Sequence, residues 1–122
     1  SNINTDLENE NNEYKTFIDT IQYTTLMNLD FIPNSVIHAL YLDMNNKSLD
    51  DRLVISSVEL ISKLKPYMKK LGYIQSREKA RRPKSCIKNI NIIDNIVNYP
   101  NYEKVMSKNV PSQCWIKKVE VD

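Results

Sequence analysis

Apolar residues recur at intervals of three and four along several stretches of this chain, the spacing that places one hydrophobic stripe on a helix. The spacing predicts helices over residues 13–29, 35–44 and 57–71, with a shorter helical piece over residues 49–54. We expect their stripes to pack together in one core, since amphipathic helices have no other way to cover apolar surface. The residues expected in this core are Phe17, Ile21, Leu40, Ile61, Leu64, Met68, Leu71 and Trp115.

Capping residues mark the beginnings of these helices. Asn34 and Ser48 precede predicted helices and have side chains suited to the N-cap. Ser56 and Glu59 have the spacing of a capping box at the start of the helix over residues 57–71. A helix is therefore expected to begin just after each of these positions.

Two residues decide how the helix over residues 57–71 runs and ends. Pro66 lies inside it and removes a backbone hydrogen bond. The helix then either kinks at Pro66 or divides into two short helices, with Pro66 in the first turn of the second and the preceding turn at Lys65. Gly72, the only glycine in the chain, is expected to supply the positive φ of the C-cap.

The rest of the chain predicts strands and two short helices. A strand is expected from Tyr73, and the isoleucine-rich run Cys86–Ile93 is expected to pair with it, so that residues 73–92 form a hairpin. Residues 113–121 alternate in polarity, as an edge strand does, and complete a three-stranded antiparallel sheet. Short helices are predicted over residues 94–98 and 102–108. The predicted fold class is α+β and mostly helical.

The order amphipathic helix, glycine, strand, basic loop, strand resembles the second half of a winged helix-turn-helix domain, over about residues 33–93. The resemblance implies that Ser57–Leu71 is the recognition helix and that Gln75–Ser85 is the wing. It also implies contact with nucleic acid through both elements. Pro66 is the clearest departure from the family's pattern.

The chain has the size and composition of one domain. Its 122 residues are 41% hydrophobic, enough to bury a core without disulfides or metals. Residues 1–12 are polar and acidic and are expected to be a disordered lead or linker, which leaves residues 13–122 as a single domain. The option that the chain is a piece of a larger protein stays open. Because uninterrupted apolar runs reach only three or four residues, we expect no membrane span and an intracellular location.

Charge is distributed unevenly along the sequence. The net charge is +2, but residues 1–60 hold three Lys or Arg against ten Asp or Glu, and residues 61–122 hold fourteen against five. The stretch Lys63–Lys88 alone has ten basic residues and one acid. Such asymmetry is typical of a surface for a polyanion, although the two halves can also neutralise each other in the fold.

The basic stretch is the candidate binding site. Lysines and arginines gain affinity for phosphates by releasing counterions, so we expect a non-catalytic nucleic-acid-binding domain, for DNA more than RNA, in a nucleus or nucleoid. The residues expected to contact phosphates are Lys63, Lys69, Lys70, Arg77, Lys79, Arg81, Arg82 and Lys84. The alternatives for this stretch are a solvated surface and a nuclear-localisation patch over residues 79–84.

The rival function is a protein–protein interaction module of a larger replication, transcription or chromatin protein, with a protein partner or a second copy of the chain. Fold alone does not separate the two functions. An exposed apolar patch would favour a protein partner. The candidate patches are Tyr23, Leu26 and Met27, or Tyr99 and Tyr102.

Catalytic and metal-binding sets are lacking, so the sequence predicts neither an enzyme nor a cofactor. The single glycine does not suffice for a phosphate-binding loop, and His38, the only histidine, is expected to be a surface or hydrogen-bonded residue. The pair Asp50 and Asp51 is expected to be a solvated cap. Cys86 and Cys114 either form a disulfide or, as we favour, are two buried thiols.

Overall fold

The computed structural model describes residues 12–77, 80–88 and 98–118, and it confirms the α+β class. The predicted lead over residues 1–12 lies outside these residues except for Asn12. A 3-10 helix, η1, occurs beside the α-helices and strands. In chain order the elements are α2 (Asn12–Gln22), η1 (Thr25–Asn28), β1 (Phe31–Pro33), α3 (Asn34–Met44), α4 (Ser57–Lys70), β2 (Tyr73–Gln75), α5 (Pro83–Cys86), α6 (Pro100–Lys108) and β3 (Cys114–Lys117).

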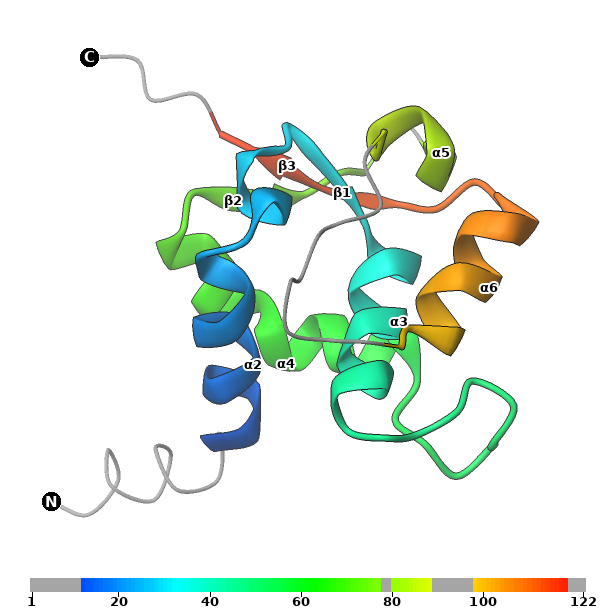
Figure 1. Cartoon of the computed structure of the whole chain (residues 1–122). Helices are drawn as coiled ribbons and strands as arrows, with labels where there is room; N and C mark the ends of the chain where they lie inside the picture. The colour runs from blue at the N-terminus through cyan, green and yellow to red at the C-terminus, as the bar shows by residue number, and fades with distance from the viewer. Residues whose placement is uncertain (1–11, 78–79, 89–97, 119–122) are drawn as a thin grey trace, which may run out of the picture.

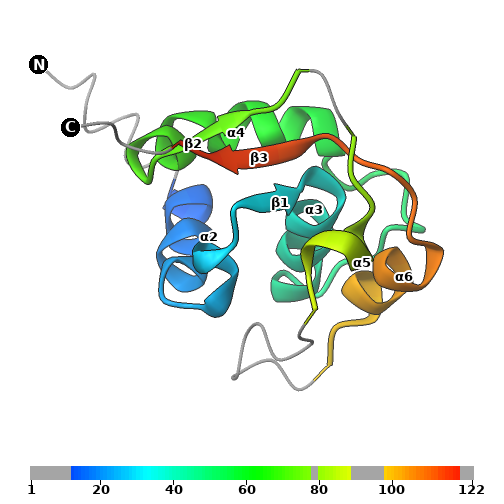
Figure 2. The same ribbon diagram turned by 90° about the horizontal axis from the view of Figure 1, so that it is seen from above.

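The three strands form one antiparallel sheet in the order β1-β3-β2. The last strand in sequence is thus the central one, so the edge position expected for residues 113–121 is wrong. Ile116 on β3 pairs with Phe31 on β1 and with Ile74 on β2. Figure 2 shows β3 between its two neighbours. With α2 before the first strand and α3 and α4 between β1 and β2, this order is consistent with a winged-helix-like arrangement.

The core lies between the sheet and the helices α2, α3 and α4, which all lie on the same side of the sheet (Figure 1). Strand side chains alternate between two faces, and Ile32, Tyr73 and Trp115 point to the helix side, where each is buried. Of the eight predicted core residues, seven are buried, and Leu71 is half-buried against the same cluster. The helical phases read from the sequence are therefore confirmed.

Helix α4 follows its predicted bounds closely. The Ser56 Oγ accepts a hydrogen bond from the Glu59 backbone N–H at 3.2 Å, as expected of an N-cap. Of the two alternatives at Pro66, the division into two helices is wrong, because α4 is continuous from Ser57 to Lys70. Gly72 follows with φ +89°, which confirms it as the residue that lets the chain leave the helix and enter β2.

The predicted hairpin over residues 73–92 is wrong in its second strand. Strand β2 pairs with β3, and Pro83–Cys86 forms a helical turn, α5. Proline favours the first position of a helical turn for two reasons. Its fixed φ is helical, and the N–H that it lacks would have no hydrogen-bond partner inside the helix at that position. Of the predicted strand Cys86–Ile93, residues 89–93 lie outside the described part of the chain. The third strand is β1, where the sequence predicted only a break between helices.

Two helix predictions also need correction. The helix expected over residues 13–29 ends at Gln22, and η1 follows. The Thr24 hydroxyl donates to the Ile21 carbonyl at 2.7 Å and accepts from the Leu26 N–H at 3.2 Å, so it takes over backbone groups at the break. Residues 49–54 form turns and no helix. The helix expected over residues 102–108 is confirmed as α6, whereas that over 94–98 lies almost wholly outside the described residues.

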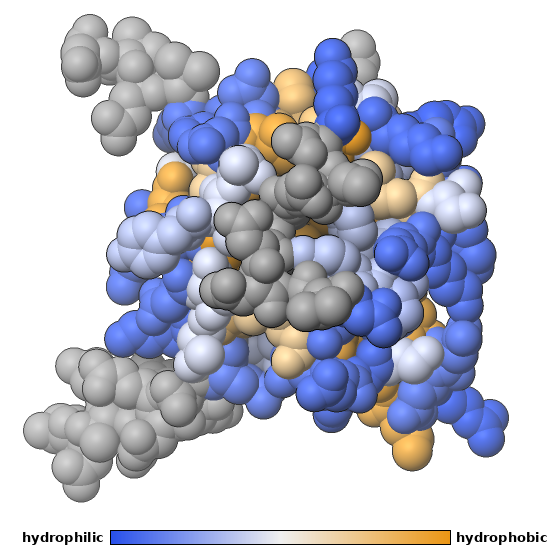
Figure 3. Space-filling view, viewed as in Figure 1, coloured by the Kyte–Doolittle hydropathy of each residue, from blue (hydrophilic) through white to orange (hydrophobic). Residues whose placement is uncertain are grey.

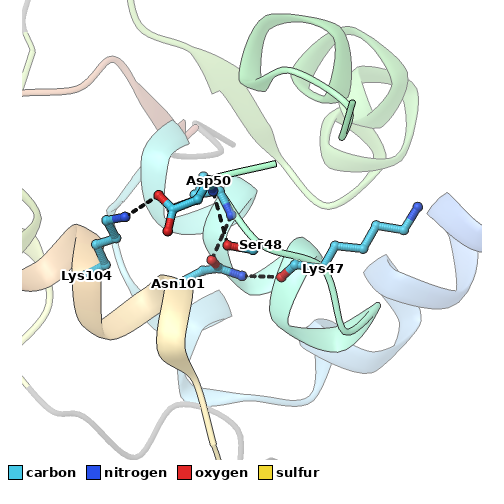
Figure 4. Close-up of polar contacts among 6 residues, drawn as sticks. Lys47, Ser48, Asp50, Asn101 and Lys104 are labelled. Atoms are coloured by element: carbon cyan, nitrogen blue, oxygen red, sulfur yellow. Dashed lines mark hydrogen bonds and ion pairs between the residues drawn. The ribbon is translucent and has the colours of Figure 1, made fainter. Parts of the chain in front are cut away.

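The connection from β2 to β3 is anchored to α3 by a buried carboxylate. Asp43, on α3, accepts hydrogen bonds from the backbone N–H groups of Asn101 and Tyr102, at 2.9 and 3.0 Å, in the first turn of α6. The Asn101 amide in turn accepts from the Leu49 N–H and donates to the Lys47 carbonyl, as Figure 4 shows. Helix α6 therefore lies beside α3 (Figure 1), and the loop after α3 is held with it.

Candidate nucleic-acid interface

Helix α4 presents the predicted Lys63, Lys69 and Lys70 to solvent. Its opposite side is fixed in the core by four buried residues, Leu60, Ile61, Leu64 and Met68. Because that stripe sets the rotation of the helix, the three lysines are exposed. These three side chains therefore project from a helix into solvent, as the sequence predicts.

Lys65 belongs to the same exposed side and was missing from the predicted contact set. At about 100° per residue, Lys65 and Lys69 form one row along the helix, and Lys63 and Lys70 form a second row roughly 130° around the axis. Of the other exposed residues, Ser62, Pro66 and the acid Glu59 lie between the two rows, and Val58 lies in line with Lys65 and Lys69. The spacing of four between Lys65 and Lys69 is a signal that the sequence already contained.

These lysines have no acidic partner within the described residues. The one ion pair found there joins Lys104 to Asp50, and neither residue belongs to α4 (Figure 4). Glu59 is the sole acid on α4 itself. Across the described residues as a whole, Lys and Arg outnumber Asp and Glu by sixteen to eight. The exposed face of α4 is therefore a basic surface that internal ion pairs do not neutralise.

The other predicted contacts lie in the connection that follows β2. Arg77, Arg81, Arg82 and Lys84 are exposed, and Lys79 lies outside the described residues. Arg81 exchanges two backbone hydrogen bonds with Ser112, at 2.8 and 2.9 Å. The described part of the expected wing, Gln75–Ser85, therefore does not form the tip of a hairpin, because backbone pairing holds Arg81 beside the segment that leads into β3.

Two of the arginines also have side-chain partners inside the molecule. The Arg81 guanidinium carbon lies 3.6 Å from the centroid of the Phe31 ring, a cation–π contact. The Arg82 Nη1 donates to the Asn109 carbonyl at 2.8 Å, and the Asn109 side chain accepts from the Lys84 N–H at 2.9 Å. Arg77 and the Lys84 side chain have no such contacts within the described residues, so they are the better placed of the four to reach a phosphate.

The remaining polar candidates are structural. His38 is 9% exposed, and its Nε2 lies 2.7 Å from the Ile55 carbonyl oxygen, which confirms a hydrogen-bonded histidine. The Asp51 carboxylate accepts from the Leu53 N–H, as a turn cap does. The ion pair with Lys104 lowers the pKa of the Asp50 carboxyl. No group of three metal-ligating side chains occurs among the described residues.

The two cysteines are free thiols, as the favoured alternative predicts, but of the two only Cys114 is buried. Cys114 is buried, and burial, followed by the proximity of Cys86, raises the pKa of its thiol to about 11. A thiol with such a pKa stays protonated near neutral pH, so it is a poor nucleophile. Cys86 is half-buried at the end of α5.

Neither of the apolar patches expected for a protein partner forms. Leu26, Met27 and Tyr102 are buried in the core, and Tyr99 is half-buried, so Tyr23 alone is exposed. Burial raises the pKa of the Tyr102 hydroxyl to about 12. Figure 3 shows a largely hydrophilic face in the orientation of Figure 1, with hydrophobic residues among hydrophilic ones at the upper margin, where the sheet lies.

Comparison with known proteins does not assign the chain to a family. No protein-family model matches the chain, and neither a curated protein nor a solved structure matches it. Within the part of the chain that the structure describes, no helix is both long and apolar enough to cross a membrane.

Proposed function

We propose that this chain binds duplex DNA without catalysing a reaction, through the exposed face of α4 and the basic residues that follow β2. The observation that carries the proposal is the pair of exposed lysine rows on α4, which have no acidic partner within the described residues. A helix that enters the major groove has a phosphate backbone on either side. Lysines on both flanks suit that position, and the strip between them holds Ser62, Pro66 and, in the first turn, Glu59.

The surrounding fold supports the same use of α4. In winged helix-turn-helix proteins the second helix of the helix-turn-helix lies in the major groove, and α4 has the matching place between α3 and β2. Arg77 and Lys84 extend the basic surface beyond the helix. A DNA-binding role of this kind belongs in a nucleus or nucleoid.

The test is the dependence of DNA affinity on salt in a variant that loses one lysine row. Lys65→Gln with Lys69→Gln removes two exposed charges and no buried contact. Each lost phosphate contact lowers the slope of log affinity against log salt by about 0.9, so the slope should fall by up to about two. The measurement is fluorescence anisotropy with a labelled 20-base-pair duplex and with the matching single strand, at several salt concentrations.

The matched control is Lys15→Gln with Arg52→Gln, which removes two exposed charges from α2 and from the loop after α3. This control should keep the slope of the unmodified chain. Equal slopes for the two double variants, or no duplex binding by the unmodified chain even at low salt, would reject the proposed interface. Tighter binding to the single strand than to the duplex would reject the major-groove geometry.

A further inference from the structure

The face of the sheet that points away from α2, α3 and α4 carries a row of three apolar side chains. Phe31, Ile116 and Ile74 are directly paired across β1, β3 and β2, so all three lie on this outer face. Ile74 is 48% exposed, and the other two are half-buried. Pro33 and Cys114 share this face but are buried, so the row is the part of its apolar surface that stays accessible.

This row forms the floor of a groove of about 420 Å³, within the usual range for binding sites. Arg77 and Arg81 also line the groove, and none of its described lining residues is acidic or belongs to α4. The Arg81 guanidinium lies over the Phe31 ring, and its planar fork of donors stays able to hold a carboxylate at the rim. The groove thus combines an apolar floor with two positive charges.

We propose that this outer sheet face is a docking site for an acidic segment of another protein, one that places an aromatic or branched side chain on the row and a carboxylate against the arginines. Charge complementarity selects that partner, because Arg77 and Arg81, with no acid among the described lining residues, attract a carboxylate and disfavour a basic segment. Because the floor of the groove is apolar, the partner must also supply an apolar side chain that packs on it. The groove contains no described residue of α4, but it shares Arg77 with the proposed DNA-binding surface.

The probes are three labelled synthetic peptides of equal length. One repeats Asp-Phe-Asp-Leu, one replaces its apolar residues with Ser and Gly, and one repeats Lys-Phe-Lys-Leu. The first should bind the unmodified chain at least about tenfold more tightly than the other two, a difference of about 1.4 kcal/mol. In the ¹⁵N-labelled chain, it should shift the amide signals of Phe31, Ile74 and Ile116.

Charge exchange provides the decisive variant. Arg77→Glu with Arg81→Glu should no longer bind the acidic apolar peptide and should bind the basic apolar peptide instead. Ile74→Ser, at a half-exposed position, should weaken the binding of the acidic peptide to the unmodified chain and of the basic peptide to the charge-exchanged variant. The control Lys65→Gln with Lys69→Gln should leave peptide binding unchanged, so this site and the DNA-binding proposal can fail separately. Circular dichroism checks that each variant is folded.

Three results would overturn the docking site. The first is equal binding of the two acidic peptides, which would mean charge attraction alone. The second is a set of shifted signals on α4 in place of the sheet. The third is competition by duplex DNA with shifts at the same sheet residues, which would assign the groove to nucleic acid.

Discussion

The side-chain amides of Asn34 and Gln75 form two reciprocal hydrogen bonds. The Asn34 Nδ2 donates to the Gln75 Oε1 at 2.8 Å, and the Gln75 Nε2 donates to the Asn34 Oδ1 at 2.9 Å. The pair joins the first residue of α3 to the last residue of β2, although β3 lies between the two outer strands. It thus fixes the start of α3 relative to the far edge of the sheet.

The amide pair should show a measurable coupling energy. Asn34→Ala or Gln75→Ala leaves the other amide half-buried without its partner, so each should lower the free energy of unfolding by about 1 to 3 kcal/mol. The double variant should cost less than the sum, by at least about 0.5 kcal/mol. Urea unfolding of the four proteins measures this, and strict additivity would mean that water replaces the missing amide at no cost.

Leu64 should be among the most sensitive core positions. Its side chain is fully buried on α4, so Leu64→Ala should lower the free energy of unfolding by about 2 to 5 kcal/mol through lost burial and the cavity left behind. Ser62→Ala, at an exposed position on the same helix, is the control and should change it by less than about 0.5 kcal/mol. A loss below 1 kcal/mol at Leu64 would contradict the rotation assigned to α4.

Asp43 should matter more for stability than an exposed aspartate does. Asp43→Ala removes both acceptors from the first turn of α6, which should lower the free energy of unfolding by about 1 to 3 kcal/mol. Asp43→Asn keeps one acceptor oxygen and should cost less. The control is Asp19→Ala, at an exposed position on α2, and similar losses for Asp19→Ala and Asp43→Ala would argue against the cap.

Tyr73 should make the fold sensitive to alkaline pH. Its hydroxyl lies 2.9 Å from the Met27 carbonyl oxygen and 3.0 Å from that of Leu29. Burial, followed by the nearby charge of Asp30, raises the pKa of Tyr73 to about 12 from its ordinary value of 10. The folded state thus favours the neutral hydroxyl, and the associated stability is complete below pH 10 and decreases as the pH rises from 10 to about 12.

The measurement for Tyr73 is urea unfolding between pH 8 and pH 12. Tyr73→Phe should be less stable near neutral pH, because a buried hydrogen bond is lost, but its stability should fall less steeply above pH 10. Tyr23→Phe alters a tyrosine that is 86% exposed, and it should follow the unmodified chain. Parallel curves for the unmodified chain and Tyr73→Phe would show that Tyr73 does not carry this pH dependence.

Local signals in the sequence were enough to predict α4 and its surroundings. A hydrophobic stripe with 3.6-residue spacing, a serine N-cap and the single glycine each act within a few residues, and the structure confirms all three at Leu64, Ser56 and Gly72. The exposure of the lysines then follows from the rotation of the helix. This part of the candidate site could be predicted for that reason.

Pairings between distant segments could not be predicted in the same way. Strand β1 has three residues, one of them Pro33, and its partner in β3 lies about 80 residues later, so no local pattern identifies it. Asn34 was expected to cap α3, but its side chain pairs with Gln75 instead. The apolar row on the outer sheet face becomes apparent only once the register that aligns Phe31, Ile116 and Ile74 is known.

The central place of β3 in the sheet sets an order for biosynthesis. A ribosome makes β1 and β2 first, and both must wait without a pairing partner until Cys114–Lys117 has been translated. During that interval the helices can collapse, but Ile32 and Tyr73 have no sheet to hold them in the core. A chain that stopped before Cys114 would expose two unpaired strand edges, a form that chaperones and proteases recognise and that tends to aggregate.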